Sequence, residues 1–200
     1  LANQITTMTI AAAAVPIFSS TVNVGTITTS SVGAVTFNGD VTGNLAYAAG
    51  VAGIYTFGAD EMLIGSVTTG TDGGGTLNFA ANTADQVSVS GTTGTSTLAL
   101  LALNIETGIG VALEQNFTGA VFARSVTLTG TGTVNFMQDV TAATEVDFNN
   151  TAAVIVMAAD KKIVGIVEAS TNPVGTLQFL ATTVDNTVLV SSTVGATQKI

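Results

Sequence analysis

The chain lacks cysteine and histidine altogether, and only four of its 200 residues are Lys or Arg. Without thiols it can form neither a disulfide nor a zinc–thiolate site. Without imidazole, the usual Ser–His and Cys–His nucleophile pairs are excluded. Any acid–base chemistry near neutral pH would therefore depend on carboxylates.

Charge is scarce as well. Charged residues make up 8% of the chain, and 13 acids against four bases give a net charge of −9. A soluble domain usually carries roughly a quarter charged residues. The negative balance would repel a phosphate backbone, so we predict no nucleic-acid partner. A polar surface of Thr, Ser, Asn and Gly is typical of exported β proteins, which predicts an extracellular or bacterial cell-surface location.

Long hydrophobic runs are absent, although 46% of the residues are hydrophobic and can bury a core. The longest apolar runs, 11–18 and 98–103, are far shorter than the roughly 20 residues of a spanning helix, and Pro16 interrupts the first. We predict no transmembrane helix. The chain starts at Leu1 without a basic segment before an apolar one, so we expect any signal peptide to be removed or to lie outside this sequence.

What the sequence does contain is a repeat of about a hundred residues. A chain of β-type segments that repeats itself is first interpreted as a solenoid. The matching segments share small, apolar and aromatic residues at the same positions. They are 33–37 with 132–136, 53–67 with 153–167, and 75–79 with 175–179.

A finer repeat lies inside each long one. A small residue opens a short alternating segment about every 21 residues, and this rhythm is broken between Ser96 and Gly132, where we expect a bulge or an insertion. The pattern predicts an all-β protein, a β-solenoid (parallel β-helix) with coils of about 21 residues and two tandem long repeats. We expect one domain over 1–200, with internal repeats at approximately 25–104 and 124–200.

Alternation within these segments separates an inner face from an outer one. A sandwich of immunoglobulin-like hairpins is the competing architecture, but hairpins alternate direction and seldom repeat their inward pattern at a fixed interval. We expect Thr36, Asn78, Asn135 and Gln178 to face water. The inward residues should stack in a common interior column, about 4.8 Å apart. They are Val35, Phe37, Tyr55, Phe57, Leu77, Phe79, Val134, Phe136, Leu177 and Phe179.

Paired carboxylates are the candidates for catalysis. They occur at Asp60/Glu61 and at Glu145/Asp147, and the second pair shares one face of a strand. Glycoside hydrolysis needs two such groups at a suitable separation. Acids beside turns or on a wet strand face usually serve solubility, so we predict that the protein is not an enzyme and has no catalytic residues.

Acids near turns are also the candidates for calcium, at Asp72, Asp85, Asp139, Asp160 and Asp185. No loop has the expected ligand spacing, and the glycine-rich segment 70–75 occurs once instead of in tandem. We therefore predict no metal and no cofactor.

Thr-x-Thr pairs offer an alternative function. Threonines ranked on a flat β-helix face are the recognised surface of some ice-binding proteins, although the ordinary strand propensity of Thr explains such pairs more simply. A flat Thr/Asn-rich face would make the chain a binding module for glycans, ice or a host receptor. The pairs are Thr7/Thr9, Thr26/Thr28, Thr127/Thr129 and Thr131/Thr133.

Three features carry a resemblance to a known family: the tandem copies, the composition rich in Thr, Ala, Val and Gly, and the segments Gly75-Thr76-Leu77-Asn78-Phe79 and Gly132-Thr133-Val134-Asn135-Phe136. In these features the chain resembles passenger regions of rickettsial surface-cell-antigen autotransporters. The resemblance covers most of the chain. It implies an elongated β-helix displayed outside the outer membrane, where it supports adhesion to a host surface or forms a coat.

The ends of such a solenoid expose unpaired strand edges, which natural proteins usually cover with polar caps. No cap is evident, because 196–200 begins another coil and 1–9 already alternates like a strand. The chain is then either a fragment of a longer array or a subunit that self-associates head to tail through open ends. The predicted function is an extracellular structural protein that stacks or polymerises into a fibre or surface coat.

Overall fold

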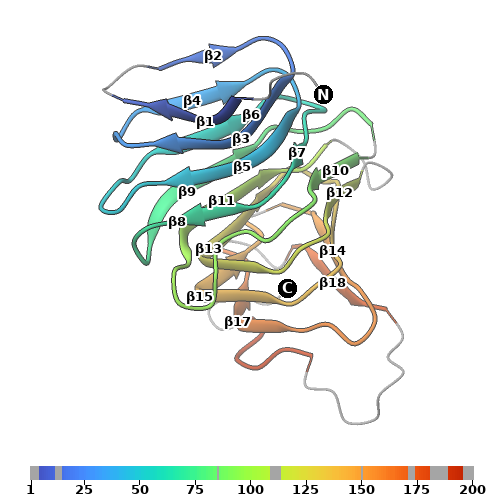
Figure 1. Cartoon of the computed structure of the whole chain (residues 1–200). Coiled ribbons are helices and arrows are strands. Elements are labelled where there is room, and N and C mark those ends of the chain that lie inside the picture. Colours follow the sequence, from blue (N-terminus) through green and yellow to red (C-terminus); the bar gives the residue numbers. More distant parts are fainter. Residues whose placement is uncertain are drawn as a thin grey trace.

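The computed structural model describes residues 5–11, 15–84, 86–108, 114–149, 151–170, 174–180 and 189–195. These residues form 18 strands and no helix. They build a β-solenoid of about eight turns, with coils about 21 residues apart, which confirms the predicted fold class (Figure 1). Every strand pair among the described residues is parallel, so a sandwich of antiparallel hairpins is excluded.

The strands lie in two sheets, and the chain crosses from one to the other at each half-turn (Figure 1). Sheet 1 has ten strands. In order along the sheet they are β1 (Ile5–Ile10), β3 (Val22–Thr29), β5 (Val41–Tyr47), β7 (Leu63–Ile64), β10 (Gln86–Val89), β12 (Glu114–Phe117), β14 (Thr133–Phe136), β16 (Val154–Met157) and β18 (Thr176–Phe179), with β8 (Val67–Thr69) beside β5.

Sheet 2 has eight strands and faces sheet 1 across the core. In order they are β2 (Ile17–Phe18), β4 (Ala34–Phe37), β6 (Ile54–Phe57), β9 (Gly74–Phe79), β11 (Leu100–Glu106), β13 (Val121–Thr129), β15 (Val140–Asp147) and β17 (Ile163–Glu168). The final described segment, 189–195, adds to this sheet through bridges from Val190 to Ile163 and from Val194 to Val167.

Alternation along each strand places apolar side chains between the sheets. In β4, for example, Val35 and Phe37 are buried while Ala34 and Thr36 are half-buried on the outer side. Phe37 stacks between the rings of the neighbouring turns, with centroids 5.3 Å from Phe18 and 5.1 Å from Phe57. Aromatic pairs at this distance add to the free energy gained from burial alone.

The aromatic side chains form two columns, where the sequence predicted one. In sheet 2 the column runs through Phe37, Phe57 and Phe79 and continues as aliphatic residues in later turns. In sheet 1 a second column contains Phe117 and Phe136. The two meet where the edge of the Phe117 ring contacts Phe79, at a centroid distance of 5.6 Å.

A half-turn offset between the repeats explains the two columns. The short strands β4, β6 and β9 of the first repeat lie in sheet 2, but their counterparts β14, β16 and β18 lie in sheet 1. The path from β4 to β14 crosses between sheets nine times, which is four and a half turns. Gly33 and Gly132 are 132 − 33 = 99 residues apart, or 22 per turn. The second repeat is therefore rotated by half a turn about the solenoid axis.

Two features of local geometry recur in both repeats. Asp60 and Asp160 both occupy the left-handed region, with φ of 62° and 60°. Gly75 (φ 71°) lies against the ring of Tyr47, as Gly175 (φ 98°) lies against the ring of Phe148. The sequence repeat thus corresponds to a repeat of turns and of core contacts.

The break in the rhythm is a longer coil. Val89 pairs with Phe117, so this turn takes 117 − 89 = 28 residues, whereas the next, from Phe117 to Phe136, takes 136 − 117 = 19. The register between β10 and β12 also shifts between Val87 and Val89. The 28-residue turn overlaps the interval between Ser96 and Gly132 where a bulge or insertion was predicted, whereas the register shift lies before that interval.

One side chain departs from the predicted outer face. Asn135 was expected to face water, but only 7% of it is exposed. Its amide nitrogen donates to Asn116 Oδ1 at 2.9 Å and to Glu114 Oε2 at 2.7 Å. Asn135 lies on the outer side of β14, and these side chains from the preceding turn cover it. The other three predicted outer residues, Thr36, Asn78 and Gln178, are half-buried or exposed.

We predict that Gly75→Ala destabilises the fold by more than Gly50→Ala. Both glycines have positive φ, 71° and 74°, so each substitution adds backbone strain of about 1 kcal/mol. A Cβ at Gly75 would in addition overlap the buried Tyr47 ring, whereas a Cβ at Gly50 meets nothing within 4 Å. Chemical denaturation of both variants measures the difference, and equal losses would contradict the contact with Tyr47.

We predict that Thr93→Val stabilises the protein by about 1–2 kcal/mol, because it removes an unpartnered hydroxyl from the core. Thr93 is fully buried between Val67 and Val121 of adjacent turns, and its Oγ1 has no hydrogen-bond partner among the described residues. Thr107→Val is the control, since the Thr107 hydroxyl donates to Thr129 O at 2.8 Å and accepts from Gly132 N at 2.9 Å. Thermal denaturation should show a higher Tm for the first variant and a lower Tm for the second.

Candidate functional site

The residues of the predicted core stack hold the two sheets together. Eight of the ten are buried at 3% exposure or less, and the last two, Leu177 and Phe179, are half-buried in the final turns. Tyr55 is the one polar member, and its hydroxyl donates to the Ala46 carbonyl oxygen at 3.0 Å. The buried eight are Val35, Phe37, Tyr55, Phe57, Leu77, Phe79, Val134 and Phe136.

The predicted carboxylate pair is brought together with a third acid. Glu145 and Asp147 lie on the outer face of β15, and Glu168 of β17 is in register with Asp147. Burial, then a hydrogen bond and charge repulsion from Glu168, raise the pKa of Glu145. Sequence reasoning missed Glu168 because it comes from the following turn, and adding one coil length to position 147 would have found it.

This acidic cluster is tied into the surrounding backbone. Asp147 is largely buried and accepts hydrogen bonds from the Ser170 hydroxyl and, at 2.8 Å, from the Asn149 backbone N–H. Within the described ranges, no group of three or more His, Cys, Asp or Glu residues has the geometry to hold a metal ion. The cluster therefore braces a turn of the chain.

The other carboxylates named by the sequence also brace turns. The Asp60 carboxylate accepts from the Thr83 hydroxyl and from the backbone N–H of Thr83 (2.6 Å) and Ala84 (3.0 Å) in the next turn. Asp72 forms an ion pair with Arg124 at 3.1 Å, and Asp139 accepts from the Lys162 N–H at 3.1 Å.

The remaining candidates for calcium are more scattered. Asp160 occupies the turn equivalent to that of Asp60, and Asp85 and Asp185 lie outside the described residues. The described three, Asp72, Asp139 and Asp160, therefore belong to separate turns and do not converge on a common point.

Threonine and asparagine side chains lie on parts of the outer faces, but they do not form one continuous row. The amide of Asn78 donates to Thr56 Oγ1 at 3.4 Å, and the amide of Asn104 donates to Asn78 Oδ1 at 2.8 Å. These amides bond to one another along the stack. The Thr-x-Thr pairs near the N-terminus, Thr7/Thr9 and Thr26/Thr28, lie in sheet 1, but Thr127/Thr129 lies in sheet 2. The predicted flat threonine surface is thus divided between two faces.

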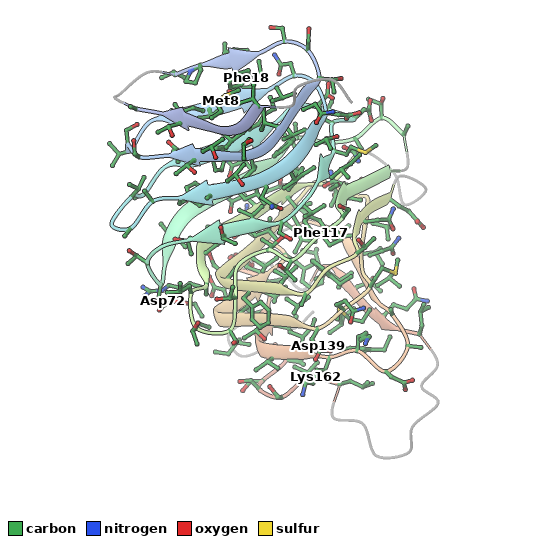
Figure 2. The ribbon with its side chains drawn as sticks, viewed as in Figure 1. Met8, Phe18, Asp72, Phe117, Asp139 and Lys162 are labelled. Carbon is green, nitrogen blue, oxygen red and sulfur yellow. The ribbon has the colours of Figure 1, made fainter. Side chains whose placement is uncertain are left out.

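The N-terminal end of the solenoid exposes strand edges and inward-facing apolar residues. Among the described strands, β1 pairs only with β3 and β2 only with β4. Met8 and Phe18 occupy inward positions above Ile27 and Phe37, yet both are only half-buried because no described strand lies beyond β1 and β2 (Figure 2). Ile5, also in an inward register, is 56% exposed.

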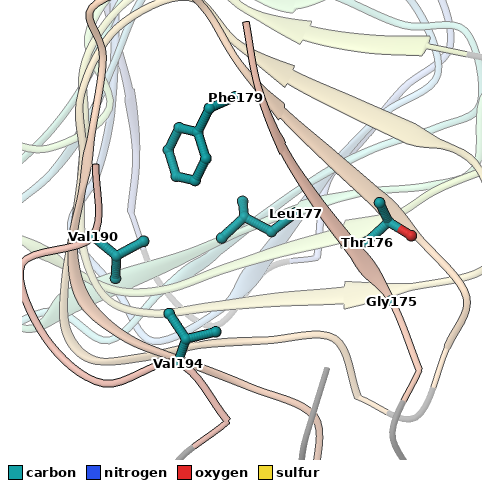
Figure 3. Close-up of a pocket in the computed structure, with 6 residues that line it drawn as sticks. All are labelled: Gly175, Thr176, Leu177, Phe179, Val190 and Val194. Carbon is teal, nitrogen blue, oxygen red and sulfur yellow. The ribbon is translucent and has the colours of Figure 1, made fainter. Parts of the chain in front are cut away.

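The C-terminal end has a matching apolar depression. The side chains of Leu177, Phe179, Val190 and Val194 point into one space of about 370 Å³, while Thr176 points away from it (Figure 3). Val194 is 45% exposed. These four residues hold the positions that are fully buried in earlier turns, so the depression is the open end of the core.

The described segments that form the two ends contain no charged residue. No charged residue precedes Asp40 in the sequence, and none occurs in the described terminal segments 174–180 and 189–195. The sequence prediction about the ends depended partly on residues 1–4 and 196–200, which lie outside the described residues. The edges themselves are formed by β1, β2, β18 and 189–195. We take these two ends as the candidate functional site.

Comparisons of the chain with models of protein families, with curated proteins and with solved structures found no match. The described residues contain no helix with the length and hydropathy needed to cross a bilayer. We therefore infer function from the geometry of the solenoid and of its ends.

We predict opposite effects of pH on two carboxylate variants. The raised pKa of Glu145 means that the fold binds a proton more tightly than the unfolded chain does, so stability is lost as pH rises from the ordinary value of 4.5 through the folded pKa. Glu145→Gln removes that loss. The pKa of Asp60 is lowered below its ordinary 3.8 chiefly by the Thr83 hydroxyl, so its contribution is present above that pH and is lost as pH falls further through the folded pKa. Asp60→Asn should therefore destabilise at pH 4 and pH 7 but much less at pH 2.

Urea denaturation at pH 2, pH 4 and pH 7 tests both variants against the parent protein. As pH rises, Glu145→Gln should gain stability relative to the parent between pH 4 and pH 7, and Asp60→Asn should lose it between pH 2 and pH 4. The same sign for both variants would contradict the environments described for these two carboxylates.

Proposed function

We propose that the chain is an extracellular structural module, a β-solenoid that stacks end to end into a fibre or surface coat. One observation carries the proposal: each end presents unpaired, uncharged strand edges together with uncovered residues of the apolar core. The function lies in this stacking, and no catalytic activity is proposed.

Edge strands of soluble proteins are usually protected against pairing. Lys side chains, Pro, bulges or covering loops prevent another chain from adding to the sheet. β1, with the sequence Ile-Thr-Thr-Met-Thr-Ile, has neither a charge nor a proline in its six residues. A second chain that pairs there would satisfy backbone groups and remove apolar side chains from water at the same time.

The direction of the strands determines the kind of assembly. All described strand pairs are parallel, so the edge at one end differs from the edge at the other. Contact between the two ends is heterologous, and a heterologous contact without ring closure generates a filament. The rigid, preformed edges also reduce the entropy lost on association.

The proposed location outside the cell has separate support. The low charge and the Thr, Ser, Asn and Gly surface are typical of exported β proteins. The resemblance to rickettsial autotransporter passengers supports display on a bacterial surface, where an elongated array can form a coat or contact a host surface.

Electron microscopy and static light scattering of the purified chain test the assembly. We expect rods or fibres that lengthen with concentration. Met8→Lys places an ammonium group on the N-terminal end face, where burial of an unpaired charge is costly, and should raise the concentration needed for assembly at least tenfold. Thr68→Lys, on an exposed outer position in the middle of the solenoid, is the control and should assemble normally.

Circular dichroism establishes that both lysine variants retain the parent β-sheet content. Monodisperse single chains of the parent protein at high concentration would contradict the proposal. So would equal inhibition of assembly by the two lysines, because the effect would then come from charge alone and not from its place on the end.

A further inference from the structure

The structure contains one joint between repeats that is already formed. It lies where β9 and β10, the counterparts of the last described segments of the chain, meet β11 and β12, the counterparts of its first strands. In sheet 2, Leu77 of β9 lies opposite Leu103 of β11. In sheet 1, Val89 of β10 lies opposite Phe117 of β12. The core passes through this joint without interruption, since Leu77, Leu103, Val89 and Phe117 are all buried.

The strands that form this joint have counterparts at the two ends of the chain. β9 corresponds to β18, because Gly75-Thr76-Leu77-Asn78-Phe79 returns as Gly175-Thr176-Leu177-Gln178-Phe179. β10 corresponds to the segment 189–195, because both follow the equivalent strands β7 and β17, through the pairs Leu63–Val89 and Ile163–Val190.

The starts of the two repeats also correspond. β11 directs Leu100, Leu103 and Ile105 inward, with spacings of three and two residues. β1 has the same spacing in Ile5, Met8 and Ile10, which are in register with Val24, Ile27 and Thr29 of the next turn. Likewise, Phe18 of β2 pairs with Phe37 as Phe117 of β12 pairs with Phe136.

We propose that the C-terminal end of the chain binds the N-terminal end of a second copy in the register of the internal joint. This inference rests on the proposed function and specifies its contact. In sheet 1, β18 pairs with β1 of the second copy. The segment 189–195 pairs with β2 in sheet 2 and, past the corner, with the start of β3, which belongs to sheet 1. Six residues of the first copy then face residues of the second copy. The pairs, first copy to second copy, are Thr176 to Thr7, Leu177 to Met8, Gln178 to Thr9, Phe179 to Ile10, Val190 to Phe18 and Val194 to Val22.

The number of half-turns makes this joint continuous. Each repeat occupies nine half-turns, so two repeats fill eighteen. The chain itself crosses between the sheets seventeen times, about eight and a half turns, and the joint completes the ninth turn. A single repeat reverses the roles of the two sheets, and a second repeat restores them. β18 therefore ends in sheet 1, where β1 of the next copy belongs, and 189–195 ends in sheet 2, where β2 belongs. At about 4.8 Å per turn, each copy adds about 43 Å to the filament.

The side chains at the two ends are complementary in this register. The depression lined by Leu177, Phe179, Val190 and Val194 receives the half-buried apolar residues Met8 and Phe18 of the second copy. No charged side chain of the described residues is brought into the joint, so no ion is buried without a partner. The outer threonines Thr7 and Thr176 then lie directly opposite each other.

Disulfide crosslinking tests the register, and the chain offers a clean background because it has no cysteine. Thr7→Cys with Thr176→Cys places two cysteines opposite each other on adjacent strands. Their Cα atoms are about 4.8 Å apart, which is within the range that a disulfide can bridge. Thr9→Cys with Thr176→Cys is the matched control. Its partners are offset by two residues, which puts their Cα atoms about 8 Å apart, beyond the reach of a disulfide.

We expect the first variant to form a ladder of covalent oligomers on mild oxidation, at least tenfold faster than the control. All three threonines are exposed, so the substitutions leave the core unchanged. Thr7 and Thr176 lie on strands at opposite ends of one solenoid, so any bridge between them joins two chains (Figure 1). A repeat of about 43 Å along the fibre axis in electron micrographs is a second expected result.

The outcomes separate this inference from the proposed function. Fibres in which the Thr7/Thr176 variant crosslinks no faster than the Thr9/Thr176 control overturn the register but leave end-to-end assembly in place. Covalent dimers of Thr7→Cys alone, at the rate of the double variant, show a head-to-head contact and overturn the joint. The absence of fibres and of crosslinks in every variant overturns both proposals.

Discussion

The structure depends on stacking of inward apolar side chains from successive turns at the spacing of hydrogen-bonded strands. The chain has no cysteine, and its described residues form no metal cluster. Strand hydrogen bonds hold each sheet together, and apolar packing holds the two sheets against each other. Each inward residue contacts its counterpart one turn away, as Phe37 does with Phe18 and Phe57. This nearest-neighbour dependence is characteristic of solenoids, whose stability is approximately a sum over repeats and their interfaces.

The half-turn offset shows how one sequence pattern can serve both sheets. A short segment such as Gly-Thr-Leu-Asn-Phe forms β9 in sheet 2 and, with Gln for Asn, β18 in sheet 1. The two sheets face each other across one core, so each presents the same requirement: alternating apolar residues inward and a small residue at the corner. The rotation of the second repeat by half a turn therefore leaves local structure intact while it moves Phe136 to the opposite side from Phe79.

Much of the fold could be predicted from the sequence, because period and alternation determine a parallel coil. The coil length, the absence of helices and the buried positions of residues such as Tyr55 and Phe57 follow from those two signals. The division into two columns did not follow, because a repeat of 99 residues does not reveal whether it contains a whole number of turns. The burial of Asn135 was also missed, since Glu114 and Asn116 reach it from another turn. The sequence predicted open strand edges at the two ends. The apolar residues that line the candidate site could be identified only from the register of the strands in the structure.

The same stacking interaction that stabilises an internal turn is left incomplete at each end. Leu177 has the position of Leu77, yet Leu77 is covered by the next turn and Leu177 is not. The free energy available for association is therefore of the same kind as the free energy of folding, and it requires no surface beyond the end strands. Because those strands are already fixed by the turns behind them, little conformational entropy is lost when another turn is added. In such a molecule, elongation by a second copy is physically equivalent to elongation of the solenoid itself.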